Sequence, residues 1–176
     1  MTNEPFPASM NVREARDRYL AVNGFTVEAY DAKWTDASFL GIKFRVPNTL
    51  QHRISIMLHD LHHVATGFGT DLAGEGEISA WEARRGLGAL GAYVGGIVAS
   101  GALMGLMLAP RRTVRAWRKS SSADSLVPKR DDFQARYEAL LAMTVGELRR
   151  ELGVPEDGVV HGPQGRHAYA PKPTMA

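Results

Sequence analysis

Residues 59–75 read HDLHHVATGFGTDLAGE, and this stretch predicts two helices joined by a glycine-rich turn. His59 and His63 are four residues apart, so they point the same way from the first helix. Asp60 lies in the same helical turn, and Glu75 begins the next helix, from which its carboxylate can reach back. Histidine is the commonest metal ligand, and a carboxylate completes a mixed nitrogen and oxygen site. The stretch therefore predicts a metal site.

The helix that carries the histidines is expected over residues 49–66, with Asn48 as its N-cap and Gly67 at its end. One side of it carries an apolar stripe: Leu50, Ile54, Met57, Leu61 and Ala65. The opposite side carries three histidines: His52, His59 and His63. Four of the six histidines in the chain lie between residues 52 and 63, which favours a metal site over the alternative, a solvent-exposed polar face. His62 points elsewhere and is expected to be structural or to support a ligand.

Glu77 and Glu82 compete with Glu75 to supply the carboxylate. Glu82 lies two turns from Glu75 on the same helical face, so it is also a candidate partner for a histidine N–H. The alternative for Glu82 is a surface salt bridge with Arg84 or Arg85.

The composition narrows the kind of protein and the kind of metal site. The chain has 176 residues, of which 44% are hydrophobic, and this predicts one folded domain. It has no cysteine, which excludes disulfides, thiolate zinc sites and cysteine nucleophiles. A metal must then be held by His, Asp and Glu, which suits zinc, iron or manganese. The formal net charge of +2 is too small to indicate a nucleic-acid partner, and the amino terminus lacks a secretory pattern, so a cytoplasmic protein is expected.

The hydrophobic periodicity is mostly helical, and we expect an all-α, single-domain helical bundle. Further helices are predicted over residues 12–22, 131–143 and 144–153. A capping-box pattern at Thr144 and Glu147 opens the last of these. Residues 39–46 are predicted to be extended. The helical domain is expected over residues 1–153, and residues 154–176, rich in Pro and Gly, are expected to form a loose C-terminal tail.

The histidine stretch resembles the metal motif of the Coq-four family of ubiquinone (coenzyme Q) biosynthesis proteins. The motif reads His59-Asp60-Leu61-His62-His63, followed after eleven residues by Glu75. Flanking residues are similar as well: Pro47-Asn48-Thr49, Thr66-Gly67-Phe68-Gly69-Thr70-Asp71, Gly74 and Ala80-Trp81-Glu82. The resemblance is strongest over about residues 44–86. The chain departs from that family in being short and in carrying a long charge-free segment.

The resemblance implies a largely α-helical protein that binds a divalent metal, usually zinc. The implied ligands are His59, Asp60, His63 and Glu75. It further implies peripheral attachment to a membrane, a prenylated quinone precursor or another isoprenoid lipid as ligand, and membership of a homodimer or biosynthetic complex. The implied activity is removal of the ring carboxylate from a polyprenylated hydroxybenzoate, in an oxidative or a simple decarboxylation. The alternative is a non-catalytic lipid-binding or scaffold protein whose metal is structural.

Decarboxylation leaves negative charge on the ring, which a cation or a proton from a nearby acid stabilises. Asp60 and Glu82 are the candidate catalytic residues for delivering this proton. Thr70 and Asp71, in the turn beside the site, are either substrate contacts or ordinary turn and cap residues.

Residues 86–110 carry no charge and are expected to form a long, apolar, glycine-rich central helix. Such a helix can span a membrane, line a tunnel for a prenyl chain, bury itself in a dimer or pack a core. Its GxxxG pairs allow close helix approach. The basic residues from Arg111 to Lys119, interleaved with Trp117, suit a membrane interface carrying anionic lipid, or alternatively a solvated basic face.

Overall fold

The described part of the chain is mostly helical, in agreement with the all-α expectation. The computed structural model describes residues 6–39, 42–120, 126 and 132–160. The α-helices are α1 (Val12–Asn23), α2 (Leu50–Thr66), α3 (Leu72–Arg85), α4 (Ala92–Leu108), α5 (Pro110–Lys119), α6 (Phe133–Ala142) and α7 (Val145–Glu151). The 3₁₀ turns are η1 (Val27–Asp31) and η2 (Leu87–Leu90), and the strands are β1 (Trp34–Phe39) and β2 (Ile42–Pro47).

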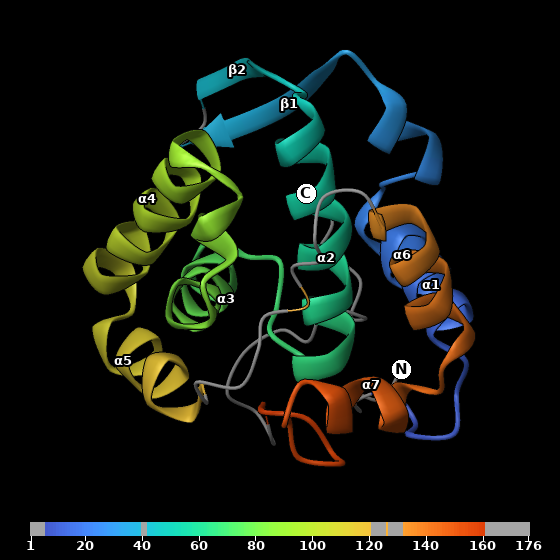
Figure 1. The fold of residues 1–176 in the computed structure, drawn as a ribbon. Coiled ribbons are helices and arrows are strands. Elements are labelled where there is room, and N and C mark those ends of the chain that lie inside the picture. Colours follow the sequence, from blue (N-terminus) through green and yellow to red (C-terminus); the bar gives the residue numbers. More distant parts are fainter. Residues whose placement is uncertain (1–5, 40–41, 121–125, 127–131, 161–176) are drawn as a thin grey trace, which may run out of the picture.

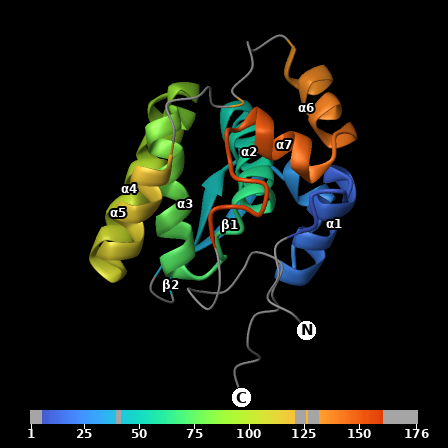
Figure 2. The same ribbon diagram turned by 90° about the horizontal axis from the view of Figure 1, so that it is seen from below.

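Helix α2 lies between two groups of helices (Figure 1). Helices α3, α4 and α5 pack together on one side of it, and α1, α6 and α7 lie on the other. The view from below separates the same two groups (Figure 2). Fully buried side chains from both sides meet around α2, among them Leu58, Leu61, Trp81, Leu140 and Leu148. The histidine-bearing helix is thus the centre of the fold.

Local signals account for most helix ends. Gly24 and Gly67 end α1 and α2 with φ of 76° and 79°, values that favour glycine. The capping box of Thr144 and Glu147 opens α7 as predicted. The predicted N-cap Asn48 is wrong by one residue, because the Thr49 side chain accepts from the N–H of His52.

Asn48 has a different role, which joins η1 to the base of a small hairpin. Its Nδ2 donates to the carbonyls of Tyr30 and Ala32, over 2.9 and 2.8 Å. The hairpin pairs β1 with β2 antiparallel, from Trp34 opposite Pro47 to Phe39 opposite Ile42. The extended segment predicted over residues 39–46 corresponds to β2, whereas β1, whose sequence WTDASF mixes apolar and polar residues without alternation, was not predicted.

The charge-free segment does not form the single long central helix that we expected. Gly91, with φ of 132°, separates η2 from α4. Helix α4 lies at the side of the molecule and packs on α3 (Figure 1). Among the described residues, no helix has the length and apolar character needed to cross a bilayer. The glycines instead bring α4 against α3, since Gly105 lies on Gly76 and Gly101 lies on Ser79.

The expected loose tail is packed over its first seven residues, 154–160. Val154, Val159 and Val160 are buried, and the N–H of Val159 donates to the carbonyl of Thr66 over 2.8 Å. The expectation is therefore wrong for this segment, because its valines cover the last turn of α2. Residues 161–176 of the expected tail lie outside the described residues.

Candidate metal centre

Helices α2 and α3 carry the candidate metal ligands toward one another. His59 and His63 lie one turn apart on α2, and Glu75 lies in the first turn of α3. The turn between the helices is tight because Gly74 lies against Gly69. A Cβ on Gly74 would come within 2.6 Å of the Gly69 carbonyl carbon, so glycine is required there. This close approach folds α3 back and sets Glu75 opposite the two histidines.

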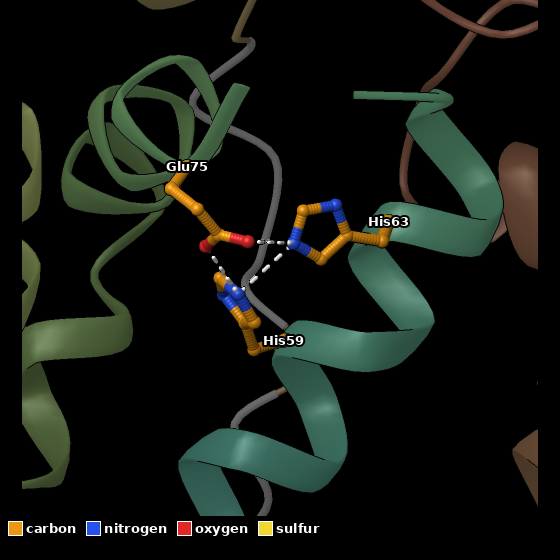
Figure 3. Close-up of side chains that lie close together, drawn as sticks. All are labelled: His59, His63 and Glu75. Carbon is orange, nitrogen blue, oxygen red and sulfur yellow. Dashed lines mark hydrogen bonds and ion pairs between the residues drawn. The ribbon is translucent and has the colours of Figure 1, made fainter. Parts of the chain in front are cut away.

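The three side chains converge on one point (Figure 3). His59 Nε2 lies 3.0 Å from His63 Nε2. The Glu75 carboxylate oxygens lie 3.3 Å from His59 Nε2 and 3.6 Å from His63 Nε2. Among the described residues, these three form the group whose ligand atoms all lie within 4.8 Å of one another. The His63 side chain is fully buried, whereas those of His59 and Glu75 are 23% and 34% exposed, so the group opens to solvent on one side.

Hydrogen bonds at the far side of each ring fix which nitrogen faces the centre. His63 Nδ1 donates to the Phe68 carbonyl over 2.9 Å, and His59 Nδ1 donates to the Glu82 carboxylate over 3.0 Å. When both imidazoles are neutral, each ring carries its N–H at Nδ1, and both Nε2 atoms face the centre as lone pairs. Two lone pairs and a carboxylate at these distances repel one another unless a metal ion, or a proton on one Nε2, lies between them. The donor set of two histidines and one carboxylate fits zinc, iron or manganese.

Glu82 contacts the Nδ1 side of the His59 ring, away from the converging atoms, and is 1% exposed. Its Oε1 also lies 2.8 Å from Nδ1 of the buried His62. Burial alone would raise the pKa of Glu82, but the charge of His59 and the two histidine hydrogen bonds lower this pKa to about 2. Burial likewise opposes charge on His59, yet Glu82 and Glu75 raise the pKa of His59. The predicted contact of Glu82 with a histidine N–H is present, and the burial of Glu82 excludes the alternative of a surface salt bridge with Arg84 or Arg85.

Asp60 is outside the group of converging ligands, although the family resemblance implied it as a fourth. One residue after His59, its side chain turns toward η1, where Oδ2 accepts from the Tyr30 hydroxyl over 2.5 Å. Asp60 is 5% exposed. Burial is the main cause that raises the pKa of Asp60, against the opposing charge of His59. The carboxyl group is therefore held beside the histidines by a tyrosine.

The remaining sequence candidates have other contacts. Glu77 forms an ion pair with Arg112 of α5 over 2.7 Å, which turns it away from the histidines. Asp71 is the N-cap of α3 and accepts from the N–H of Gly74. The Thr70 hydroxyl donates to Asn23 of α1 over 2.6 Å. For Thr70 and Asp71, the described contacts are those of turn and cap residues.

Three groups at the site gave no signal in the sequence. The Phe68 carbonyl belongs to a turn for which the sequence predicted only the end of a helix. Tyr30 reaches Asp60 from η1, thirty residues earlier. Tyr19 of α1 stacks on His63, with ring centres 5.3 Å apart. Each contact joins segments far apart in the chain or uses the backbone, so side-chain spacing could not reveal it.

Glu82→Gln is expected to weaken metal binding while leaving the three ligands in place. The amide cannot accept from His59 and His62 as a carboxylate does, and such supporting changes cost about 10- to 100-fold in metal affinity. Competition titration with a chromophoric chelator measures the affinity. The control is Glu77→Gln, on the same helix, which should bind metal as the parent chain does. An unchanged affinity in Glu82→Gln would show that His59 is oriented by its helix alone.

Comparisons of the chain with models of known protein families, with curated proteins and with solved structures give no match. The candidate metal site is therefore inferred from its geometry. Three candidate ligands converge, and the rings of His59 and His63 are each oriented by a hydrogen bond from Nδ1.

Proposed function

We propose that the chain binds a divalent metal at His59, His63 and Glu75 and is a metal-dependent carboxy-lyase. The observation that supports metal binding is the convergence of two Nε2 lone pairs and a carboxylate at 3.0–3.6 Å. The proposed substrate, a polyprenylated hydroxybenzoate-type ring of ubiquinone or related prenyl-quinone biosynthesis, rests on the resemblance to the Coq-four family. Zinc is the proposed metal, with iron or manganese for an oxidative reaction.

A metal held by three protein ligands has a position open to water or substrate, as in catalytic rather than structural sites. When bound, it supplies a Lewis acid for the ring carboxylate. The exposed edges of His59 and Glu75 form the side from which a substrate can enter. Once carbon dioxide has left, the ring carbon needs a proton. Asp60 suits this role better than Glu82, since burial raises the pKa of Asp60 while the histidines lower that of Glu82.

Metal-loaded protein is expected to release carbon dioxide from a carboxyl-labelled, 3-prenylated 4-hydroxybenzoate. Asp60→Asn should retain the metal and lose about 100-fold or more in turnover, because it removes a general acid. Labelled gas release measures the rate, and elemental analysis measures the metal. His52→Gln is the matched control, since His52 lies on α2 outside the ligand group. Full turnover in Asp60→Asn would exclude Asp60 as the acid.

The alternative function is a non-catalytic prenyl-lipid-binding or scaffold protein with a structural metal. A structural site is closed by a fourth protein ligand, whereas a catalytic one keeps an exchangeable water. If metal-loaded protein releases no carbon dioxide and its cobalt form has no ligand that azide can displace, the results support the scaffold hypothesis over the enzyme hypothesis.

We also propose that α4 and α5 attach the protein to the inner face of a membrane. Most large apolar side chains that the described residues expose lie on these two helices, with Leu103 60% and Met107 77% exposed. Residues 92–119 contain no acidic residue. Arg111, Trp117 and Arg118 of α5 are all exposed. An apolar face flanked by cations and tryptophan is typical of helices that lie on anionic lipid.

Replacing both Arg111 and Arg118 with Gln should weaken binding to phosphatidylserine-containing vesicles by about 30-fold, at about 1 kcal/mol for each cation. Vesicle co-sedimentation measures the partition coefficient. The control variant removes two exposed arginines of α1, Arg13 and Arg18, and should bind nearly as the parent chain does. Equal losses in both variants would indicate attraction by net charge alone. Failure of the parent chain to bind vesicles would leave a homodimer or biosynthetic complex as the occupant of this surface.

A further inference from the structure

A cavity lies beside α1 and α6, apart from the candidate metal ligands. It is lined by residues of α1, η1, α2 and α6, is open to solvent and has a volume of about 270 Å³. None of the residues that line it belongs to the group of His59, His63 and Glu75. The mechanism proposed above uses no lining residue directly, although Tyr30, which donates to Asp60, is one of them.

Part of the cavity wall is apolar. Ile54, Met57 and Leu141 are buried side chains that line it. Val27 and Leu50 line it as well and remain 41% and 54% exposed. The apolar stripe of α2 expected from the sequence thus faces this cavity over its first two turns. Exposed apolar side chains around a hollow favour an apolar occupant.

The same cavity is lined by three arginines, each of which pairs with a carboxylate: Arg13 with Glu138, Arg16 with Asp17 and Arg53 with Asp31. Arg16 is 4% exposed, and its Nη1 donates to the Tyr137 hydroxyl over 3.0 Å. The Arg53 Nη1 pairs with Asp31 over 2.9 Å, but the Asp31 side chain is 80% exposed. Exposed pairs of this kind contribute little, so Asp31 is a weak competitor for an incoming anion.

Arg53 carries a donor that is still unused. Its Nε is buried and has no hydrogen-bond acceptor among the residues that the structure describes. A buried donor without an acceptor is costly and rare in folded proteins. A guanidinium presents its Nε–H and Nη–H groups as a fork that fits a carboxylate. An anionic ligand that displaces Asp31 and turns the guanidinium toward the cavity would therefore satisfy a group that the chain leaves unsatisfied.

We propose that this cavity binds a small organic carboxylate, its apolar part against Ile54, Met57 and Leu141 and its carboxylate on Arg53 beside Arg13 and Arg16. The volume lies at the lower end of small-molecule pockets, roughly 300–1,000 Å³. It therefore suits a short alkyl chain or a single ring and excludes a polyprenyl chain. The proposal goes beyond the carboxy-lyase function and does not depend on the metal.

Octanoate is the probe, and isosteric octanamide is its neutral counterpart. Titration of methyl-labelled protein should shift the methyl signals of Met57, Ile54 and Leu141 with octanoate, and octanamide should bind about tenfold more weakly because it lacks the charged acceptor. Arg53→Gln should lose about the same factor. Arg18→Gln, which removes an exposed arginine of α1 that does not line the cavity, is the matched control and should bind as the parent chain does.

Two further variants keep the result unambiguous. Leu50→Trp places a larger side chain at an exposed position on the wall, so it should block octanoate without unfolding the protein. Glu75→Gln, which lacks a metal ligand, should bind octanoate unchanged; loss of binding there would mean that the carboxylate binds a metal and would overturn the proposal. Equal affinity for octanoate and octanamide, or no binding at about 10 mM octanoate, would overturn it too.

Discussion

Glu75→Gln is expected to lower the affinity for zinc by on the order of a hundredfold. The substitution keeps the shape of the side chain and removes the negative charge of the carboxylate, whose two oxygens face His59 and His63 at 3.3 and 3.6 Å. The side chain is 34% exposed, so loss of its charge should leave the fold intact. Two imidazoles alone hold a divalent ion weakly, because a mixed site needs the negative charge of a carboxylate.

Apo-protein titrated with zinc in the presence of a competing chelator measures this affinity, and elemental analysis gives the stoichiometry. Glu77→Gln is the matched control, since Glu77 lies two residues away on α3 and pairs with Arg112 instead. A double variant, His59→Ala with His63→Ala, should retain no metal. If Glu75→Gln keeps the affinity of the parent chain, Glu75 is not a ligand. The metal found in the parent chain separates a simple decarboxylation, with zinc, from an oxidative one, with iron or manganese.

Gly76→Ala is expected to destabilise the protein by about 3 kcal/mol, because overpacking forces the backbone to move. At Gly76, helices α3 and α4 approach so closely that an added Cβ would lie 2.8 Å from the backbone nitrogen of Gly105. The reverse substitution meets the same contact, since a Cβ on Gly105 would lie 2.6 Å from the Gly76 Cα. The gain in helix propensity from glycine to alanine, about 1 kcal/mol, cannot offset this clash.

Thermal unfolding followed by circular dichroism should show a decrease in Tm of roughly 6–12 °C for Gly76→Ala. Gly96→Ala is the matched control, because Gly96 lies within α4 and a Cβ there would meet nothing within 4 Å. This control should be neutral or more stable by up to about 1 kcal/mol. If Gly76→Ala unfolds at the temperature of the parent chain, α4 can move away from α3 at little cost.

The sequence predicts the parts of this molecule that depend on near neighbours in the chain. The carboxyl ends of α1 and α2, the capping box of α7 and the pairing of His59 with His63 all follow from spacings of a few residues. Glu75 is also predictable, since one short turn separates it from the histidines. These features depend on helix geometry, which repeats the same way wherever it occurs.

The features that could not be predicted depend on contacts across the fold. Asp60 has the right spacing for a ligand, yet a tyrosine from η1 holds its carboxylate. The charge-free segment has the composition of one long helix, yet Gly91 divides it. The glycines of α4 pack closely against α3. The cavity lined by Arg53 brings together residues from four elements. Tertiary packing decides each of these outcomes, and it leaves no periodic trace in the sequence.

The last turn of α2 depends on the far end of the chain. Arg149 Nε donates to the carbonyl of Ala65 over 2.9 Å, and the N–H groups of Val159 and Val160 donate to the carbonyl of Thr66. During synthesis the ribosome delivers residues 149–160 long after the histidines have emerged. The carboxyl end of α2 is therefore covered only after residues 149–160 have been synthesised, and contacts between such distant segments form late and slow folding.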